Sequence, residues 1–260
     1  MSGERGSGAL FFVNCPLKCV YCQNATIAHG EAGVSVSVEQ LASVMCDLQR
    51  QGALNINCVT PTHYAIDIAR AVAQARSSGL SIPVVWNTSG YEREDAVSFL
   101  AGTVNVYLAD FKYASSEMAA RYSHAPDYPE VALCALETMV DAVGEPCYDE
   151  VDGMPRMTSG VVVRHLLLPG GLEESKKALA LLHERFGMTV CYSIMNQYTP
   201  VLYGENLERF PELGRRASDE EYEQLLDYAD SIGIEDYCWQ DGPAAEESFI
   251  PAWDGEGLIS

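Results

Sequence analysis

The sequence is poor in positive charge. Its 260 residues contain 16 lysine and arginine side chains against 37 aspartate and glutamate side chains, which gives a formal net charge of −21. A field of this sign repels phosphate backbones and anionic lipids, so we expect neither nucleic acid nor a membrane surface as a partner. Residues 205–260 alone carry 16 acidic and three basic side chains. A solvated surface is the simpler interpretation of that excess, and a basic partner surface is the alternative.

The sequence also lacks a run of 18 apolar residues and an N-terminal segment of the signal-peptide type. Its nine cysteines are odd in number, with three clustered and six dispersed, which favours a reducing compartment over a disulfide framework. We therefore expect a cytoplasmic protein. Because no linker or low-complexity stretch divides the chain, we predict a single domain over residues 1–260, with a core at about 8–233 and an irregular acidic tail at 234–260.

Strand-like and helix-like patterns alternate along the chain. We predict strands at 9–14, 55–60, 83–87, 104–109, 161–168 and 189–195. We predict helices at 38–51, 63–78, 93–101, 116–122, 128–142, 172–186 and 218–232. Serine at the start and Gln or Glu three residues later predict capping boxes at Ser37–Gln40 and Ser218–Glu221. The helix at 63–78 has an apolar face containing Ile66, Ala69 and Ala73, and the Pro- and Gly-containing stretch 145–160 is predicted to be a loop or hairpin.

Six strand–helix units in series predict an α/β fold with a parallel sheet and right-handed crossovers. Either a doubly wound sheet or a partial barrel would satisfy this pattern, and hydrophobic periodicity does not separate the two.

Three cysteines lie within eight residues. Cys15, Cys19 and Cys22 are spaced C-x3-C-x2-C directly after the apolar run 9–13. Thiolates on one loop can converge on zinc, iron or an iron–sulfur cluster. Three is one short of the four ligands that close a structural zinc site or a ferredoxin cluster, so an iron would stay open for a substrate or cofactor. Half of a zinc ribbon, or a site closed by Cys46 or Cys58, is the alternative.

Every predicted strand carries polar residues at or near its carboxyl end. In parallel β/α architectures the active site lies at the carboxyl ends of the strands, so these groups are expected to share one site. They lie at 15–24, 60–63, 87–89, 110–112, 164–165 and 196–198. Asp110 and Lys112 point the same way and can pair. Arg164 lies in an apolar strand and needs a partner, either a cofactor carboxylate or a structural salt bridge, while His165 faces the opposite side.

The string Cys15-x3-Cys19-x-Tyr21-Cys22 resembles the signature of the radical S-adenosylmethionine (radical SAM) superfamily. The wider string from Arg5 to Asn24 resembles more narrowly the pyruvate formate-lyase-activating enzyme-like proteins. The superfamily resemblance implies a partial (β/α)6 TIM-like barrel with parallel strands. It also implies a 4Fe–4S cluster bound by Cys15, Cys19 and Cys22, whose open iron chelates S-adenosylmethionine.

This resemblance implies an oxidoreductase. The cysteines would act as iron ligands and electron conduit, and one electron would cleave S-adenosylmethionine to methionine and a 5′-deoxyadenosyl radical that abstracts hydrogen from a substrate. A flavodoxin or ferredoxin is the expected type of one-electron donor. The narrower resemblance implies a glycine of a glycyl-radical enzyme as the substrate. Radical modification of another peptide or small molecule, or a non-enzymatic iron–sulfur or zinc protein, is the alternative.

The resemblance also implies a set of cofactor-binding residues at the strand ends. They are Tyr21, Gln23, Asn24, Thr60, Thr62, Asn87, Ser89, Asp110, Arg164, Asn196 and Gln197. One position departs from the superfamily pattern, because Thr60-Pro61-Thr62-His63 stands where many members carry Gly-Gly-Glu. The string Thr-Pro-Thr-His-Tyr is shared with the narrower group.

Overall fold

Parallel strands that pair in the order of the sequence form the centre of the molecule. The computed structural model describes residues 6–238. Its parallel strands are β1 (Gly8–Phe11), β2 (Ile56–Val59), β3 (Val84–Thr88), β4 (Val106–Asp110), β6 (Met154–Leu166), β7 (Cys191–Met195) and β8 (Tyr237–Cys238). Each crossover therefore moves the same way across the sheet, as in a barrel, whereas a doubly wound sheet reverses direction at a switch point. The predicted α/β fold with a parallel sheet is confirmed.

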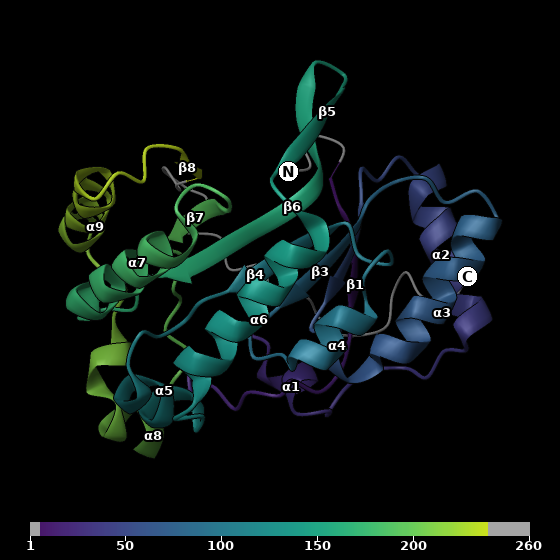
Figure 1. Ribbon diagram of the computed structural model, residues 1–260. Helices are drawn as coiled ribbons and strands as arrows, with labels where there is room; N and C mark the ends of the chain where they lie inside the picture. The colour runs from purple at the N-terminus through teal and green to yellow at the C-terminus, as the bar shows by residue number, and fades with distance from the viewer. Residues whose placement is uncertain (1–5, 239–260) are drawn as a thin grey trace.

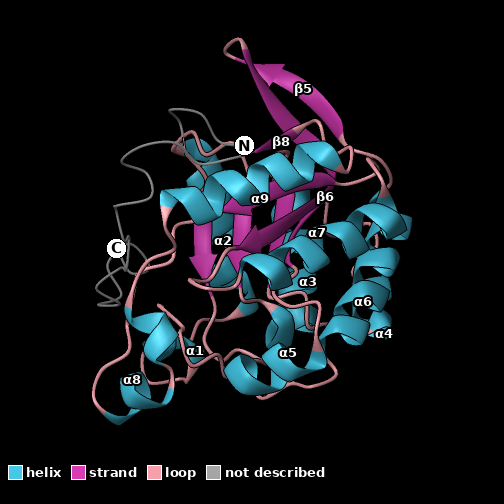
Figure 2. Ribbon diagram, turned by 90° about the vertical axis from the view of Figure 1, so that its left-hand side faces the viewer, coloured by secondary structure: helices cyan, strands magenta, loops and turns pink. Residues whose placement is uncertain are grey.

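Most of the helices form a layer on one face of this sheet, as Figure 1 shows. They are α2 (Val38–Arg50), α3 (Ala65–Ser77), α4 (Glu94–Phe99), α6 (Tyr128–Val143), α7 (Leu172–Phe186) and α9 (Asp219–Ser231). Short helices lie at the end to which the parallel strands point (Figure 2): α1 (Ala25–Ala28), α5 (Ser116–Ser123) and α8 (Glu205–Arg209). The 3-10 turns η1 (Thr62–Tyr64) and η2 (Pro211–Gly214) complete the connections.

The two faces of the sheet have separate cores because strand side chains alternate between them. The large core under the helices contains Trp86, Tyr107 and Tyr192. The opposite face carries a small apolar cluster of Val85, Val106, Leu108, Met157 and Val162, against which Cys191 packs. On this same face, beyond the apolar cluster, polar groups lie near the carboxyl ends of the strands.

Several local predictions are confirmed. Both capping boxes are present, at Ser37–Gln40 and at Ser218–Glu221. Helix α7 has the predicted bounds, because glycines lie at both of its ends. The stretch 145–160 is a hairpin in which β5 (Cys147–Val151) pairs antiparallel with β6 and projects from the sheet (Figure 1). Strand β6 therefore begins at Met154, well before the predicted residue 161.

Two predictions need correction. Helix α3 buries Ile68, Ala71, Val72 and Ala75, whereas Ile66 is 58% exposed and Ala73 is exposed. The predicted apolar face is therefore wrong, because alanines lie on several faces of this helix and its periodicity fits more than one buried side. The segment from 234 is not irregular throughout, because Tyr237 and Cys238 pair with Tyr192 and Ser193 of β7. The remainder of the predicted tail lies outside the described residues.

No helix within residues 6–238 is long and apolar enough to cross a membrane.

Gly90 allows the loop after β3 to approach the end of β4. Its φ is +79°, and a Cβ there would lie 2.2 Å from the carbonyl oxygen of Asp110 and 3.3 Å from the hydroxyl of Tyr128. Gly102 has a similar φ of +75°, but a Cβ there would meet nothing within 4 Å. Both glycines thus have a positive φ, but only Gly90 lies against the backbone of another segment.

We predict that Gly90→Ala destabilises the protein more than Gly102→Ala. Both substitutions place a Cβ at positive φ, which costs roughly 1–2 kcal/mol. Only Gly90→Ala adds a clash with backbone, and overpacking typically costs about 1–3 kcal/mol more. Urea denaturation of the two variants measures the difference in unfolding free energy. Equal losses would show that the loop moves away from Asp110 without cost.

Candidate active site

The cysteine loop between β1 and α1 is held by backbone hydrogen bonds. Asn14 and Cys15 donate to the carbonyl oxygens of Ile27 and Ala28 at 2.9 and 3.0 Å, which closes the loop on α1. The N–H of Val20 donates to the carbonyl oxygen of Tyr122 in α5 at 2.8 Å. Leu17 is 2% exposed and anchors the loop in the core.

The three thiols of this loop are half-buried and unpaired with one another. Burial raises the pKa of Cys15 to about 11 and also raises that of Cys22, against hydrogen bonds from the backbone at Leu17 and Asn24 and the positive charge of Lys112. Among the described residues, no three His, Cys, Asp or Glu side chains are arranged to hold a single metal ion. A cluster bound through three different irons does not need its cysteines around one ion, and binding it would displace the thiol protons.

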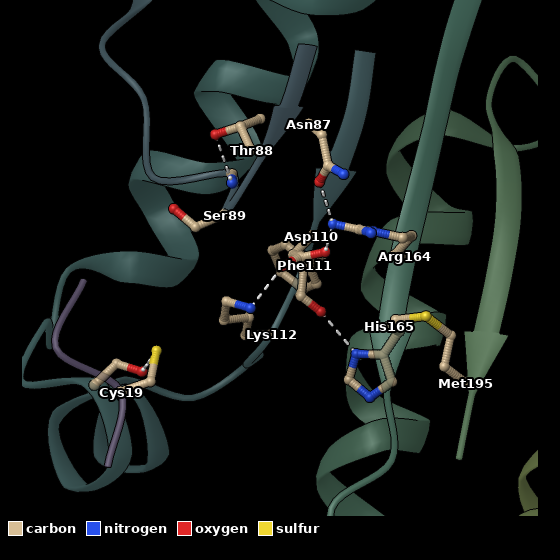
Figure 3. A network of polar contacts seen from close by, with 12 residues as sticks. Cys19, Asn87, Thr88, Ser89, Asp110, Phe111, Lys112, Arg164, His165 and Met195 are labelled. Carbon is tan, nitrogen blue, oxygen red and sulfur yellow. Dashed lines mark hydrogen bonds and ion pairs between the residues drawn. The ribbon is translucent and has the colours of Figure 1, made fainter. Parts of the chain in front are cut away.

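A polar network lies beside the loop (Figure 3). The Asp110 carboxylate accepts from Lys112 Nζ at 2.6 Å and from Arg164 Nη2 at 2.7 Å. Arg164 Nη2 also donates to Asn87 Oδ1 at 2.6 Å. Asp110 and Arg164 are register partners on β4 and β6, so both side chains leave the sheet on the same face. The predicted pairing of Asp110 with Lys112 is confirmed.

Opposite charges hold this network in its ionised form. Burial favours neutral Asp110, but the charges of Arg164 and Lys112 outweigh it and lower the pKa of Asp110. Burial likewise favours neutral Lys112, yet Asp110 raises the pKa of Lys112, and Cys19 adds to the same effect. Lys112 is therefore a cation close to the cysteine loop.

Two of the buried polar atoms at this edge of the sheet have no hydrogen-bond partner among residues 6–238. They are Ser89 Oγ, directly after β3, and Arg164 Nε in β6. Buried polar groups are nearly always hydrogen-bonded, so atoms left without a partner at a strand end indicate a polar ligand. A donor at Arg164 and a hydroxyl at Ser89 suit carboxylate and hydroxyl groups.

Tyr128, at the start of α6, joins two loops of the site. Its hydroxyl lies 2.8 Å from the carbonyl oxygen of Ser89 and 2.9 Å from that of Asp110, and it accepts the N–H of Lys112 at 2.9 Å. The Tyr91 ring stacks on it at 6.0 Å between centroids. The ends of β3 and β4 are thus fixed to each other by one side chain.

Glu92 joins the loops after β2 and β3. Its Oε1 accepts from Thr62 Oγ1 at 2.7 Å, from Thr88 Oγ1 at 2.5 Å and from Trp86 Nε1 at 3.3 Å. Glu92 is 4% exposed, and burial raises its pKa above the ordinary value of 4.5 although the three hydrogen bonds oppose the rise. The carboxylate therefore fixes Thr62 relative to β3.

The remaining residues that sequence analysis assigned to the site have different surroundings. Tyr21 is 7% exposed, and its hydroxyl is hydrogen-bonded to that of Tyr113. Gln23 and Asn24 are half-buried between Cys22 and α1. Asn196 and Gln197 follow β7, where Asn196 is half-buried and Gln197 is exposed. The structure thus brings Asn87, Ser89, Asp110 and Arg164 together at the ends of β3, β4 and β6.

His165 lies on the other face from Arg164, as expected. Its ring nitrogens lie 2.7 Å from the carbonyl oxygen of Phe111 and 2.9 Å from Ser175 Oγ, and burial lowers its pKa. Sequence reasoning missed Glu92, Tyr128 and Ser123, whose hydroxyl donates to Cys19 Sγ at 2.9 Å. Each acts through a tertiary contact to another loop, and no local sequence pattern signals such a contact.

The chain belongs to the radical SAM superfamily, because residues 10–168, more than half of its length, match the family described as "Radical SAM superfamily". Membership carries a 4Fe–4S cluster and S-adenosylmethionine as cofactors. A curated relative is the uncharacterized protein MJ0674 of Methanocaldococcus jannaschii, 25% identical over 239 residues. That match covers 88% of this chain and 63% of the relative, so the chain spans less than two thirds of the relative's length.

Solved structures share the fold. SuiB of Streptococcus suis bound to S-adenosylmethionine superposes with a TM-score of 0.60 at 15% identity, over 92% of this chain and 51% of SuiB. HydG, a maturase of the [FeFe]-hydrogenase, gives 0.60 at 15% identity, over 93% and 53%. The enzyme anSMEcpe with bound S-adenosylmethionine gives 0.56 at 12% identity, over 89% and 63%. These likenesses agree with the partial TIM-like barrel and do not single out pyruvate formate-lyase-activating enzymes.

The donor set at the strand ends fits these cofactors. Three thiols on a loop held by α1 and α5 suit the cluster, and the partnerless Arg164 Nε and Ser89 Oγ lie at strand ends, where a polar cofactor binds in this architecture.

We predict that Glu92 makes stability depend on pH. Its pKa is raised in the folded protein, so the proton is bound more tightly there than in the unfolded chain. The stability that this contributes is present below about pH 4.5 and is lost as the pH rises through the folded pKa. Glu92→Gln keeps an acceptor oxygen but does not titrate. The difference between the unfolding free energies of the wild type and of Glu92→Gln should therefore decrease as the pH rises from about 4.5 through the folded pKa of Glu92.

Urea denaturation of the apoprotein at a series of pH values measures this difference. A difference that increases with pH would mean that the three hydrogen bonds outweigh burial at Glu92.

Proposed function

We propose that this chain is a radical SAM enzyme in which Cys15, Cys19 and Cys22 ligate three irons of a 4Fe–4S cluster and the residues at the strand ends bind S-adenosylmethionine. The observation that carries the proposal is a three-thiol loop at the same edge of the sheet as two buried polar atoms, Ser89 Oγ and Arg164 Nε, that lack partners in the described part of the chain. When bound, the cluster and S-adenosylmethionine supply one-electron reductive cleavage to a 5′-deoxyadenosyl radical.

The chain's own residues would bind and orient the cofactor. Arg164 Nε is available for a carboxylate, because only its Nη2 is used by Asp110 and Asn87. Ser89 offers a hydroxyl at the end of β3, and Asn87 lies directly before Thr88 in that strand. Lys112 keeps a positive charge beside the cysteines, which favours their thiolate form. Thr60 and Thr62 replace the usual Gly-Gly-Glu segment, and Glu92 fixes the hydroxyl of Thr62.

A closed iron–sulfur or zinc site is less well supported. The fourth ligand that it needs was expected from Cys46 or Cys58. The thiol of Cys46 instead donates to the carbonyl oxygen of Ala75 at 3.7 Å, and Cys58 is fully buried in β2 within the core under the helices.

We predict that S-adenosylmethionine perturbs the EPR spectrum of the reduced, reconstituted protein and that dithionite then yields 5′-deoxyadenosine. Replacing Cys15, Cys19 or Cys22 by Ala should abolish cluster uptake and product. Cys147→Ala is the matched control because Cys147 is exposed and lies in the β5–β6 hairpin, and it should retain both. An unchanged spectrum with no 5′-deoxyadenosine from the wild type would refute the proposal.

The proposed substrate is a peptide or protein segment, with a glycine Cα as the specific candidate. Support comes from the narrower resemblance and from the fold shared with SuiB, which is also known bound to its precursor peptide SuiA. Radical modification of a small molecule is the alternative.

We predict that a peptide with deuterated glycine transfers deuterium into 5′-deoxyadenosine, which mass spectrometry detects. The same peptide with deuterated alanine in place of glycine is the control. Transfer from neither peptide, with 5′-deoxyadenosine still formed, would exclude this substrate and leave the cofactor chemistry intact.

A further inference from the structure

A line of buried hydroxyl groups ends on the sulfur of Cys19. The hydroxyl oxygens of Tyr21 and Tyr113 lie 2.7 Å apart, and that of Tyr113 lies 2.7 Å from Ser123 Oγ. Ser123 Oγ lies 2.9 Å from Cys19 Sγ. The residues come from the cysteine loop, the segment after β4 and the last turn of α5.

Packing leaves this line little freedom to rearrange. Tyr21 is 7% exposed, Tyr113 1% and Ser123 2%. The Tyr21 ring packs edge-to-face on Tyr122 with centroids 6.2 Å apart, and Tyr113 packs similarly on Tyr128 at 5.5 Å. The hydrogen bond from Val20 N to Tyr122 O fixes the cysteine loop to α5 one residue before Ser123. Both ends of the Ser123–Cys19 contact are therefore attached to the same rigid unit.

The hydrogen bond to Cys19 differs in kind from those at the other two cysteines. Cys15 and Cys22 receive hydrogen bonds from the backbone at Leu17 and Asn24, which side-chain substitution does not remove. Cys19 receives one from the Ser123 side chain. A substitution at position 123 can therefore remove the hydrogen bond to Cys19.

The direction of the protons follows from counting them, given the proposed role of Cys19 as an iron ligand. A ligating thiolate carries no proton, so Ser123 must donate to the sulfur. The Ser123 oxygen then accepts from Tyr113, and the Tyr113 oxygen accepts from Tyr21. All three O–H groups point toward Cys19, and such an aligned series strengthens each bond in it.

We propose that Ser123 is a positioning residue whose hydrogen bond to Cys19 raises the reduction potential of the cluster, with Tyr113 and Tyr21 strengthening that bond. Reduction adds negative charge that spreads onto the ligating sulfurs. A donor aimed at one of these sulfurs stabilises the reduced state more than the oxidised state, and hydrogen bonds to sulfur are among the factors that set such potentials. This inference rests on the proposed function.

The test is a redox titration of the anaerobically reconstituted protein, followed by EPR, in wild type and variants. Ser123→Ala should lower the midpoint potential, so that the ratio of reduced to oxidised cluster at a fixed potential falls about tenfold, equal to about 59 mV for one electron. Tyr113→Phe should shift the potential the same way by less, because it removes only the proton donated to Ser123. Ser123→Thr retains a hydroxyl and should restore the potential.

Ser175→Ala is the matched control. Ser175 lies in α7, is 3% exposed and is hydrogen-bonded to His165 of β6. The variant therefore also removes a buried, hydrogen-bonded serine hydroxyl, but one away from the cysteines. It should leave the midpoint potential unchanged. Iron content and thermal unfolding of each variant separate a change in potential from a loss of structure.

The outcomes separate the two proposals. If Ser123→Ala binds full iron and keeps the wild-type potential, the inference is wrong while the proposed function stands. If Ser123→Ala fails to take up iron, Tyr113→Phe decides, and an unchanged potential in that variant overturns the inference. If the wild type forms no cluster that responds to S-adenosylmethionine, the proposed function itself fails.

Discussion

The carboxylate of Asp110 is shared by two cations, Arg164 on the neighbouring strand and Lys112 just beyond its own strand. Charges withdrawn from water are stable only when their partners are present, so these three side chains hold their geometry as a set. Because Asp110 and Arg164 are register partners, their pairing joins the last residue of β4 to β6 two residues before β6 ends. Lys112 is held in place by the same carboxylate, and its charge favours the thiolate forms of Cys15 and Cys22. One acidic side chain thus connects the strand ends to the cysteine loop.

Two further side chains extend this fixed geometry to the neighbouring loops. Tyr128 reaches from α6 to the backbone after β3 and β4, which is possible because Gly90 lets those segments approach. Glu92 joins the loops after β2 and β3 through three donors on one oxygen. Neither residue offers its side chain to the space above the strands. Both instead satisfy polar groups of the loops internally, whereas Ser89 Oγ and Arg164 Nε have no hydrogen-bond partner among the described residues. A ligand that completes their hydrogen bonding meets little reorganisation cost.

Local chemistry made parts of this arrangement predictable. Capping boxes located α2 and α9, flanking glycines bounded α7, and the pairing of Asp110 with Lys112 followed from their spacing along a strand. The buried face of α3 was not predictable, because an alanine-rich helix presents apolar groups on several sides and the sheet chooses among them. Glu92, Tyr128 and Ser123 were missed for a related reason. Their partners lie 16 to 104 residues away in most of these contacts, so their roles exist only once the loops are assembled.

Thr60 shows how the loop after β2 depends on its neighbours. Its φ is +57°, a conformation that a β-branched residue rarely adopts and that costs on the order of 1–3 kcal/mol. The cost is sustained because the flanking groups are fixed: Thr60 N donates to the Asn87 carbonyl oxygen at 2.9 Å, Pro61 is buried, and Thr62 is bonded to Glu92. A glycine would adopt this backbone with little strain. Hydrogen bonds to distant residues therefore stabilise a turn that glycine would adopt without them. The conformation of Thr60 depends on the positions of β3 and Glu92.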